Sequence, residues 1–118
     1  MGCWNFSSLT PASGSTQKVL THVLTLMGHK VQTAATVQEA LALAQSDSFD
    51  LLISDIALPD GSGLDVMRWF AMHRPIRGIA VSGYGMDADI QASRDAGFAV
   101  HLVKPIPISE LRESIQDV

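Results

Sequence analysis

The segment "FDLLISDIALPDGSGLDVM", Phe49–Met67, decides the fold of this chain. Its first part, Phe49–Ser54, is mostly apolar and lacks polar alternation, which is typical of a strand covered on both faces, as parallel strands are. The run ends at a single carboxylate, Asp55, and a loop rich in Pro, Asp and Gly follows. Because open parallel sheets bind ligands outside the carboxyl ends of their strands, Asp55 is predicted to lie at a functional edge.

The rest of the chain alternates between helical and extended patterns. Apolar residues at helical spacing end at Gly28. Thr36 and Glu39 form a capping box, in which each side chain satisfies a free backbone N–H group of the next helix. We predict helices over 19–27, 37–45, 64–74, 87–96 and 107–116, and further strands over 29–34, 76–83 and 98–104. Short connections between alternating strands and helices predict an α/β fold with a parallel sheet.

The N-terminal segment does not follow this alternation. The stretch "SSLTPASGS" is rich in Ser, Gly and Pro, and the sequence assigns it to no element. The opening "MGCWNFSS" lacks the Ser or Thr of an N-myristoylation signal, because Phe6 stands there, so no lipid anchor is expected. Cys3 is the single cysteine, which excludes an internal disulfide and is compatible with a reducing cytosol.

The composition limits the class of function. The 118 residues suffice for one domain with a core of its own, and 47% hydrophobic against 17% charged residues indicates a globular chain. A formal net charge of −4 gives no electrostatic basis for binding nucleic acid. No apolar run approaches the roughly 20 residues that a membrane-spanning helix needs. We therefore expect a cytoplasmic domain that binds neither nucleic acid nor membrane.

Three polar residues stand at the carboxyl ends of successive predicted strands: Asp55, Ser82 and Lys104. Such a set can handle a phosphoryl group, with the carboxylate as nucleophile, the ammonium neutralising phosphate oxygens and the hydroxyl donating to one of them. Taken singly, each has a simpler interpretation. Asp55 and Ser82 are common turn residues, and Lys104 is compatible with an ordinary solvated lysine. Their joint position on three strand ends favours the functional interpretation.

The motifs "DIALPDGSGLDVMR", "IAVSGYG" and "HLVKPI", in this order and spacing, resemble the receiver domain of two-component response regulators and of hybrid sensor histidine kinases. The resemblance extends from about Ser13 to Val118. It implies a doubly wound (βα)5 flavodoxin-like fold, with a five-stranded parallel sheet in the order 2-1-3-4-5. It also implies a non-enzymatic signalling module that takes a phosphoryl group from a kinase histidine and responds by a conformational switch.

The resemblance assigns roles by position. Asp55 would be the phosphoacceptor and a Mg²⁺ ligand, Lys104 the lysine beside it, and Ser82 the switch hydroxyl. The backbone carbonyl of Ala57 would be a second Mg²⁺ ligand. His101 falls where the family usually has a switch Tyr or Phe, and a partly buried structural histidine is the alternative.

The chain departs from the family at its first strand. Receivers end that strand in two adjacent acidic residues that hold Mg²⁺, and counting back from the first helix places Pro11 and Ala12 there. Since Mg²⁺ needs carboxylate and water oxygens, we expect it to bind weakly. We accordingly divide the single receiver domain, 1–118, into an atypical leader, 1–12, and a clear receiver pattern, 13–118. Either the leader is non-native, which we favour, or the chain is a degenerate receiver.

Other classes fit less well. A haloacid-dehalogenase-type phosphatase needs a second Asp where Ala57 stands, and Val66 replaces the third Gly of a dinucleotide-binding turn. Ser82 lacks the flanking pattern of a nucleophile elbow, and the four histidines lack metal-ligand spacing. The remaining alternative is a degenerate receiver that binds proteins without phosphorylation.

The expected partners are a sensor histidine kinase or phosphotransfer protein and a downstream output protein or domain. The resemblance leaves open whether the chain is a stand-alone receiver or part of a hybrid kinase. The residues of its motifs resemble those of hybrid-kinase receivers more.

Overall fold

The computed structural model of the chain describes residues 7–12, 14–83, 87–104 and 108–116. Its main sheet is parallel and has the strand order β2-β1-β3-β6-β7. These strands are β1 (Ser7–Pro11), β2 (Lys30–Ala34), β3 (Leu51–Asp55), β6 (Arg77–Ser82) and β7 (Val100–Val103). A short antiparallel pair, β4 (Ala57–Leu58) and β5 (Gly61–Ser62), follows β3. Leaving this small pair aside, the order is the predicted 2-1-3-4-5.

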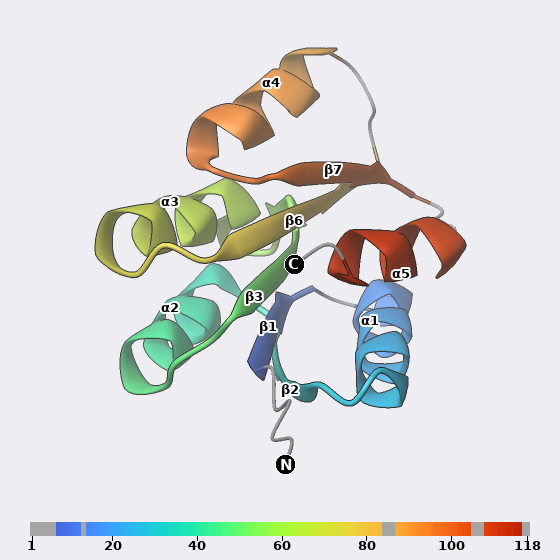
Figure 1. The fold of residues 1–118 in the computed structure, drawn as a ribbon. Helices are drawn as coiled ribbons and strands as arrows, with labels where there is room; N and C mark the ends of the chain where they lie inside the picture. Colours follow the sequence, from blue (N-terminus) through green and yellow to red (C-terminus); the bar gives the residue numbers. More distant parts are fainter. Residues whose placement is uncertain (1–6, 13, 84–86, 105–107, 117–118) are drawn as a thin grey trace.

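Helices cover both faces of the sheet (Figure 1). One side carries α2 and α3, and the other carries α1 and α5, while α4 lies beside the β7 edge (Figure 1). Their bounds are α1 (Gly14–Leu26), α2 (Val37–Ser46), α3 (Gly63–His73), α4 (Asp87–Ala96) and α5 (Ile108–Gln116). The doubly wound architecture is therefore confirmed.

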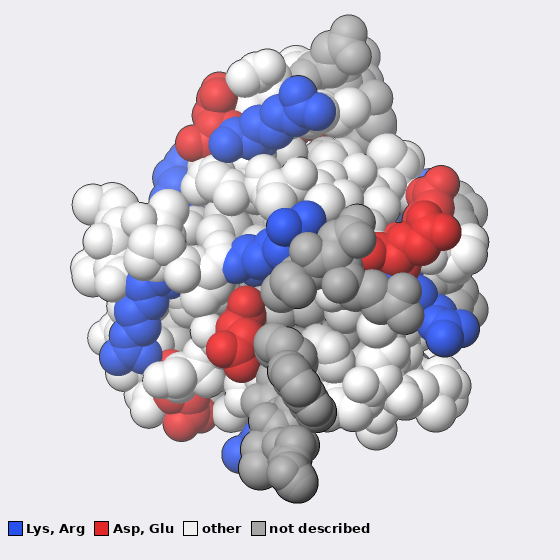
Figure 2. Space-filling model, in the orientation of Figure 1, with Lys and Arg blue, Asp and Glu red and all other residues white. Residues whose placement is uncertain are grey.

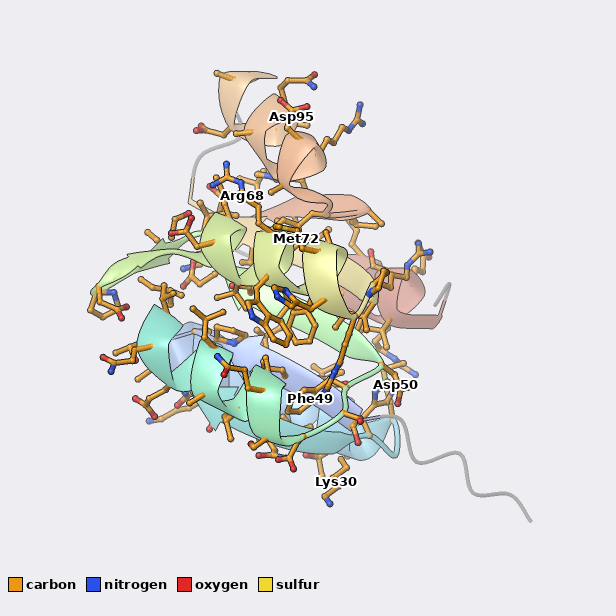
Figure 3. All side chains as sticks on the ribbon, turned by 90° about the vertical axis from the view of Figure 1, so that its left-hand side faces the viewer. Lys30, Phe49, Asp50, Arg68, Met72 and Asp95 are labelled. Carbon is orange, nitrogen blue, oxygen red and sulfur yellow. The ribbon has the colours of Figure 1, made fainter. Side chains whose placement is uncertain are left out.

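The core has two layers, one on each face of the sheet. Leu52 of β3 packs with the cluster that includes Phe70 of α3, whereas its neighbours Leu51 and Ile53 pack with the cluster under α1 and α5. The Phe49 ring meets the Phe70 ring edge to face at a centroid distance of 6.4 Å. Both rings belong to the cluster on the side of the sheet that carries α2 and α3 (Figure 3). Both faces of β3 are buried, which explains why its sequence lacks polar alternation.

The segment that the sequence assigned to no element forms β1, which lies between β2 and β3 in the sheet, and the start of α1, so the missing assignment is corrected. Ser8 and Thr10 of β1 are completely buried. Their hydroxyls nevertheless have partners: Ser8 Oγ lies 2.9 Å from His29 Nδ1, and Thr10 Oγ1 donates to the Gln32 carbonyl at 3.4 Å. Buried hydroxyls are tolerated when they are hydrogen-bonded. This segment can therefore form a buried strand without the usual run of Val, Ile and Leu.

Pro11 limits how far β1 pairs with β3. Pairing with β2 runs from Ser7 to Pro11, but pairing with β3 covers only Ser8 and Leu9. The N–H of Ala12 donates to Ala34 of β2, and successive N–H groups of a strand point to opposite neighbours. The donor that Pro11 lacks is therefore on the β3 side, where the ladder stops.

Candidate functional site

Asp55 and Lys104 form an ion pair at the carboxyl edge of the sheet. The Lys104 ammonium nitrogen, Nζ, lies 2.9 Å from Asp55 Oδ2. The carboxylate side chain is only 5% exposed, while the lysine side chain is 35% exposed. The carboxylate is thus largely shielded from solvent beside a positive charge, whereas the lysine side chain is partly open to solvent.

Ser82 lies at the same edge. It is buried at the end of β6, and its backbone carbonyl accepts a hydrogen bond of 2.7 Å from the Lys104 N–H. The carbonyl of Val81, the residue before it, accepts from the N–H of Ile56 at 2.9 Å. These two bonds fix the segments that follow β3 and β7 against the end of β6. The three residues predicted from the strand ends are therefore brought to one edge of the sheet.

Gly63 is a residue of this edge that sequence reasoning missed. A Cβ atom at this position would overlap the Asp55 carbonyl oxygen and Ser54 Oγ. The same carbonyl accepts a hydrogen bond of 2.9 Å from Ser54 Oγ, and the N–H of Gly63 donates to Ile56. Helix α3 therefore starts in direct contact with the end of β3, and only glycine fits there. The sequence feature that could have indicated this contact is the Gly-Ser-Gly run, but by itself that run resembles a nucleotide-binding turn.

Asp60 is a second missed residue, and it joins the loop after Asp55 to helix α2. Its Oδ1 accepts from Val37 N–H at 2.7 Å and its Oδ2 from Gln38 N–H at 3.1 Å. The predicted cap is also present, since Glu39 N–H donates to Thr36 Oγ1 at 3.1 Å. Two side chains from separate segments thus satisfy three free N–H groups of α2. The sequence showed Pro-Asp-Gly only as a turn.

This contact predicts a pH dependence of stability. The hydrogen bond from Val37 lowers the pKa of Asp60 below its ordinary value of 3.8; slight desolvation opposes this effect and the hydrogen bond from Gln38 reinforces it. A carboxylate with a lowered pKa stabilises the fold fully above that ordinary value, and the effect disappears as pH falls through the folded-state pKa. Asp60→Asn is therefore expected to unfold at lower urea concentration than the wild type at neutral pH, with the difference shrinking below pH 3.8. An equal difference at all pH values would contradict the assignment.

His101 lies in β7, directly paired with Ala80 of β6. Its Nδ1 is 2.9 Å from the hydroxyl of Ser93 in α4. The imidazole at the predicted switch position is thus tied to a neighbouring helix. The sequence pointed to His101 but gave no indication of its partner.

The acidic pair that the resemblance implies is absent from the described residues at this edge, where Pro11 and Ala12 stand instead. Pro11 is the last residue of β1, and Ala12, which follows it, is completely buried within the apolar cluster under α1 and α5. Ala57, whose carbonyl was the other predicted ligand, lies exposed in β4. Across the residues that the structure describes, no three His, Cys, Asp or Glu side chains gather as a metal site. One carboxylate, already paired with Lys104, is a poor fit for Mg²⁺.

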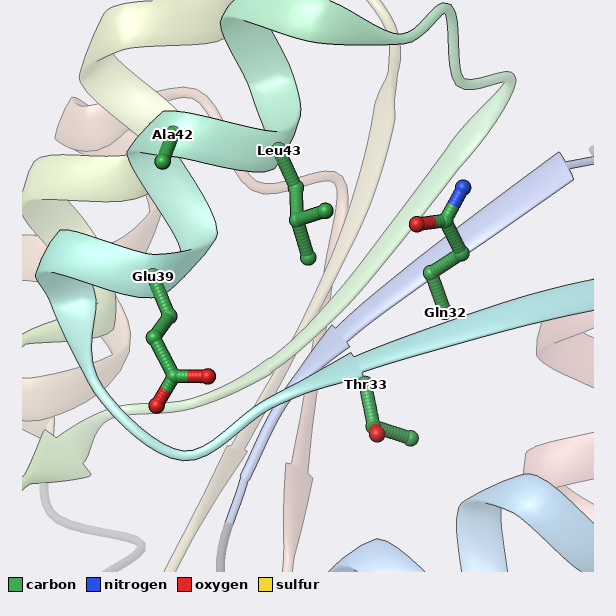
Figure 4. Close-up of a pocket in the computed structure, with 5 residues that line it drawn as sticks. All are labelled: Gln32, Thr33, Glu39, Ala42 and Leu43. Carbon is green, nitrogen blue, oxygen red and sulfur yellow. The ribbon is translucent and has the colours of Figure 1, made fainter.

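Other surface features lie away from this edge. A hollow of about 530 Å³ between β2 and α2 is lined by Gln32, Thr33, Glu39, Ala42 and Leu43, none of which belongs to the site (Figure 4). On the face shown in Figure 2, acidic and basic side chains are interspersed between large uncharged areas. Within the described part of the chain, no helix is both long enough and apolar enough to cross a membrane.

Comparison with known proteins agrees with this geometry. The sequence model of the response regulator receiver domain matches residues 13–116. The chain is 38% identical over 86 residues to the response regulator protein PilR of Pseudomonas aeruginosa, covering 71% of this chain but only 19% of that protein. It is 30% identical over 102 residues to the polar-differentiation response regulator DivK of Brucella ovis, covering 84% of this chain and 83% of DivK.

Solved structures show the same fold. The chemotaxis response regulator CheY4 of Vibrio cholerae superimposes with a TM-score of 0.85 at 27% identity, covering 96% of this chain and 97% of that one. The receiver domain of a sensor histidine kinase of Pseudomonas aeruginosa, described with a magnesium ion in its active-site cleft, gives a TM-score of 0.84 at 23% identity, with 96% of each chain covered. The family model matches residues 13–116, and the fold and the pair of Asp55 and Lys104 at the sheet edge agree with it. This chain belongs to the response regulator receiver domain family.

Proposed function

We propose that Asp55 accepts a phosphoryl group from a histidine of a sensor kinase or phosphotransfer protein. A carboxylate oxygen of Asp55 attacks phosphorus and forms an acyl phosphate. The bond between phosphorus and the donor histidine breaks, and its electron pair returns to the ring nitrogen, which takes up a proton. The observation that supports this most is the 2.9 Å contact between the buried carboxylate and Lys104.

Lys104 and Ser82 have separate roles in this proposal. The side chain of Lys104 is 35% exposed, so its ammonium can follow the added phosphoryl oxygens and neutralise their charge. The hydroxyl of Ser82 donates a hydrogen bond to one of these oxygens. Phosphorylation then draws Ser82 toward Asp55 and lets His101 reorient, which changes the surface formed by β6, α4 and β7. Such activation is a population shift between two arrangements, biased by the new charge.

Mg²⁺ is proposed to bind this chain only weakly. It is described in the cleft of a related receiver, but the groups left here to hold it are the Asp55 carboxylate and the Ala57 carbonyl. Phosphorylation of the chain as it stands is therefore expected to be slow.

The proposed setting is the cytoplasm, either in a stand-alone receiver or in a hybrid histidine kinase, with an output protein or domain as the downstream partner.

The test is labelling with acetyl phosphate as a small-molecule donor, followed by intact-mass measurement. One added phosphoryl group per chain is expected, and hydroxylamine or acid should release it, because acyl phosphates are labile to both. A label that resists hydroxylamine would indicate a Ser, Thr or His adduct and would contradict the proposal. Failure to label under any condition, even after a metal site has been restored as described in the Discussion, would leave the chain a phosphorylation-independent binding module.

A further inference from the structure

Ser93 of α4 makes two contacts through one buried hydroxyl. The residue is completely buried. Its Oγ donates to the Ile90 carbonyl at 2.9 Å and lies 2.9 Å from His101 Nδ1. We propose that Ser93 is a positioning residue for His101, which fixes the protonation of its ring and holds β7 against α4 before phosphorylation. The consequence for signalling rests on the proposed function above.

The two contacts of the Ser93 hydroxyl together favour one tautomer of His101, because the hydroxyl has only one hydrogen to donate. A serine hydroxyl has one hydrogen to donate and two lone pairs that accept. If its hydrogen goes to the Ile90 carbonyl, the contact with Nδ1 is a hydrogen bond only when Nδ1 carries a hydrogen and donates it to Oγ. In the neutral ring, Nε2 is then the unprotonated nitrogen. When both contacts are hydrogen bonds, His101 is therefore in its Nδ1–H form.

The register of the sheet places this contact next to the phosphorylation edge. Residues paired across parallel strands project to the same face, and side chains alternate along each strand. His101 is paired with Ala80, so Ser82, two residues further along β6, projects to that face as well. Leu102 projects to the other face and packs in the cluster under α1 and α5. Any reorientation of His101 that follows the movement of Ser82 must break the contact with Ser93.

Breaking that contact leaves the Ser93 hydroxyl without one partner in a fully buried position. Buried polar groups that lose a partner are destabilised, so the contact favours the arrangement seen here. Ser93→Ala removes the hydroxyl and with it this preference. The variant should therefore reach the switched arrangement more easily, while leaving Asp55 and Lys104 untouched.

The experiment is ¹⁵N NMR of the imidazole rings in alkaline buffer, with wild type compared to Ser93→Ala. His73 is an internal reference, because its Nδ1 lies 2.9 Å from the Trp69 carbonyl, which can only accept. In the wild type, His101 and His73 should both show the Nδ1–H pattern. In Ser93→Ala, only His101 should shift toward the Nε2–H form. An Nε2–H pattern for His101 in the wild type, or an unchanged pattern in the variant, would overturn the proposal.

Labelling with acetyl phosphate supplies the second readout. The labelling rate of Ser93→Ala should exceed that of the wild type by roughly fivefold, which corresponds to about 1 kcal/mol, the usual net contribution of one hydrogen bond. A tautomer that changes without any change in rate would overturn the link to the switch. A tautomer that changes in a chain that never accepts phosphate would support the positioning role and refute the proposed function, so the two failures are distinguishable.

Discussion

Asp55→Asn is expected to abolish phosphorylation of the chain by acetyl phosphate. The amide has nearly the shape of the carboxylate but is a far weaker nucleophile, and it carries no charge to pair with Lys104. Because the native carboxylate is 5% exposed and 2.9 Å from that ammonium, the change also leaves Lys104 without this anionic partner. The expected result is complete loss of the hydroxylamine-sensitive label, measured by intact mass.

Asp65→Asn is the matched control. Asp65 is also an aspartate of the segment that follows β3, but its side chain is 56% exposed and paired with Arg68 at 3.2 Å. Exposed pairs of this kind contribute little to stability. The control should label like the wild type and unfold at nearly the same urea concentration. Labelling that survives in Asp55→Asn would remove Asp55 from its role, whatever the control does.

Replacing Pro11 and Ala12 together by Asp is expected to make phosphorylation dependent on Mg²⁺ and to raise its rate by about tenfold or more, which corresponds to about 1.4 kcal/mol of activation free energy. An incoming phosphoryl dianion and the Asp55 carboxylate repel each other, and two unit charges 4 Å apart interact by about 4 kcal/mol near a protein surface. A metal ion held between them reduces this repulsion. In the wild-type chain, Lys104 is the cation that the described structure places beside Asp55.

The same double variant should be less stable than the wild type when no metal is present. Ala12 is completely buried, so a carboxylate there is desolvated, which disfavours its charged form. Replacing Pro11, in contrast, supplies a backbone N–H on the β3 side of the strand. Added Mg²⁺ should raise the melting temperature of the variant and leave that of the wild type nearly unchanged. A wild-type chain that binds Mg²⁺ and labels as fast as the variant would show that the first strand was aligned wrongly.

The sequence predicted those parts of the fold whose signal is local. Capping by Thr36 and the helix stop at Gly28, which has a φ of +86°, depend on neighbouring residues, and both are present in the structure. The helix 87–96 was predicted with its observed bounds. The strand order came from the family resemblance and from right-handed connection rules.

The parts that the sequence missed depend on contacts between distant segments. Ser8 and Thr10 are polar, so their sequence does not predict a buried strand. Their hydrogen bonds to His29 and Gln32, on or next to β2, make them suitable for an interior strand. Asp60 looks like a turn residue, and its role depends on Val37 and Gln38 at the start of α2, which lie 23 and 22 residues earlier in the chain. For Ser93, periodicity gave no sign that its hydroxyl meets His101. In each case a polar side chain acquires its role from a partner that only the folded chain supplies.

Titration with beryllofluoride and Mg²⁺, followed by NMR, tests most directly whether Asp55 is the phosphoacceptor of this edge, because beryllofluoride imitates an aspartyl phosphate. We expect signals from Ser82, His101 and Lys104 to shift, weakly in the wild type and fully in the double variant with Asp at positions 11 and 12. Adding Asp55→Asn to that variant should remove every shift. Shifts that survive the loss of Asp55, or that are confined to the β2 edge with Ser82 and His101 unchanged, would contradict this assignment.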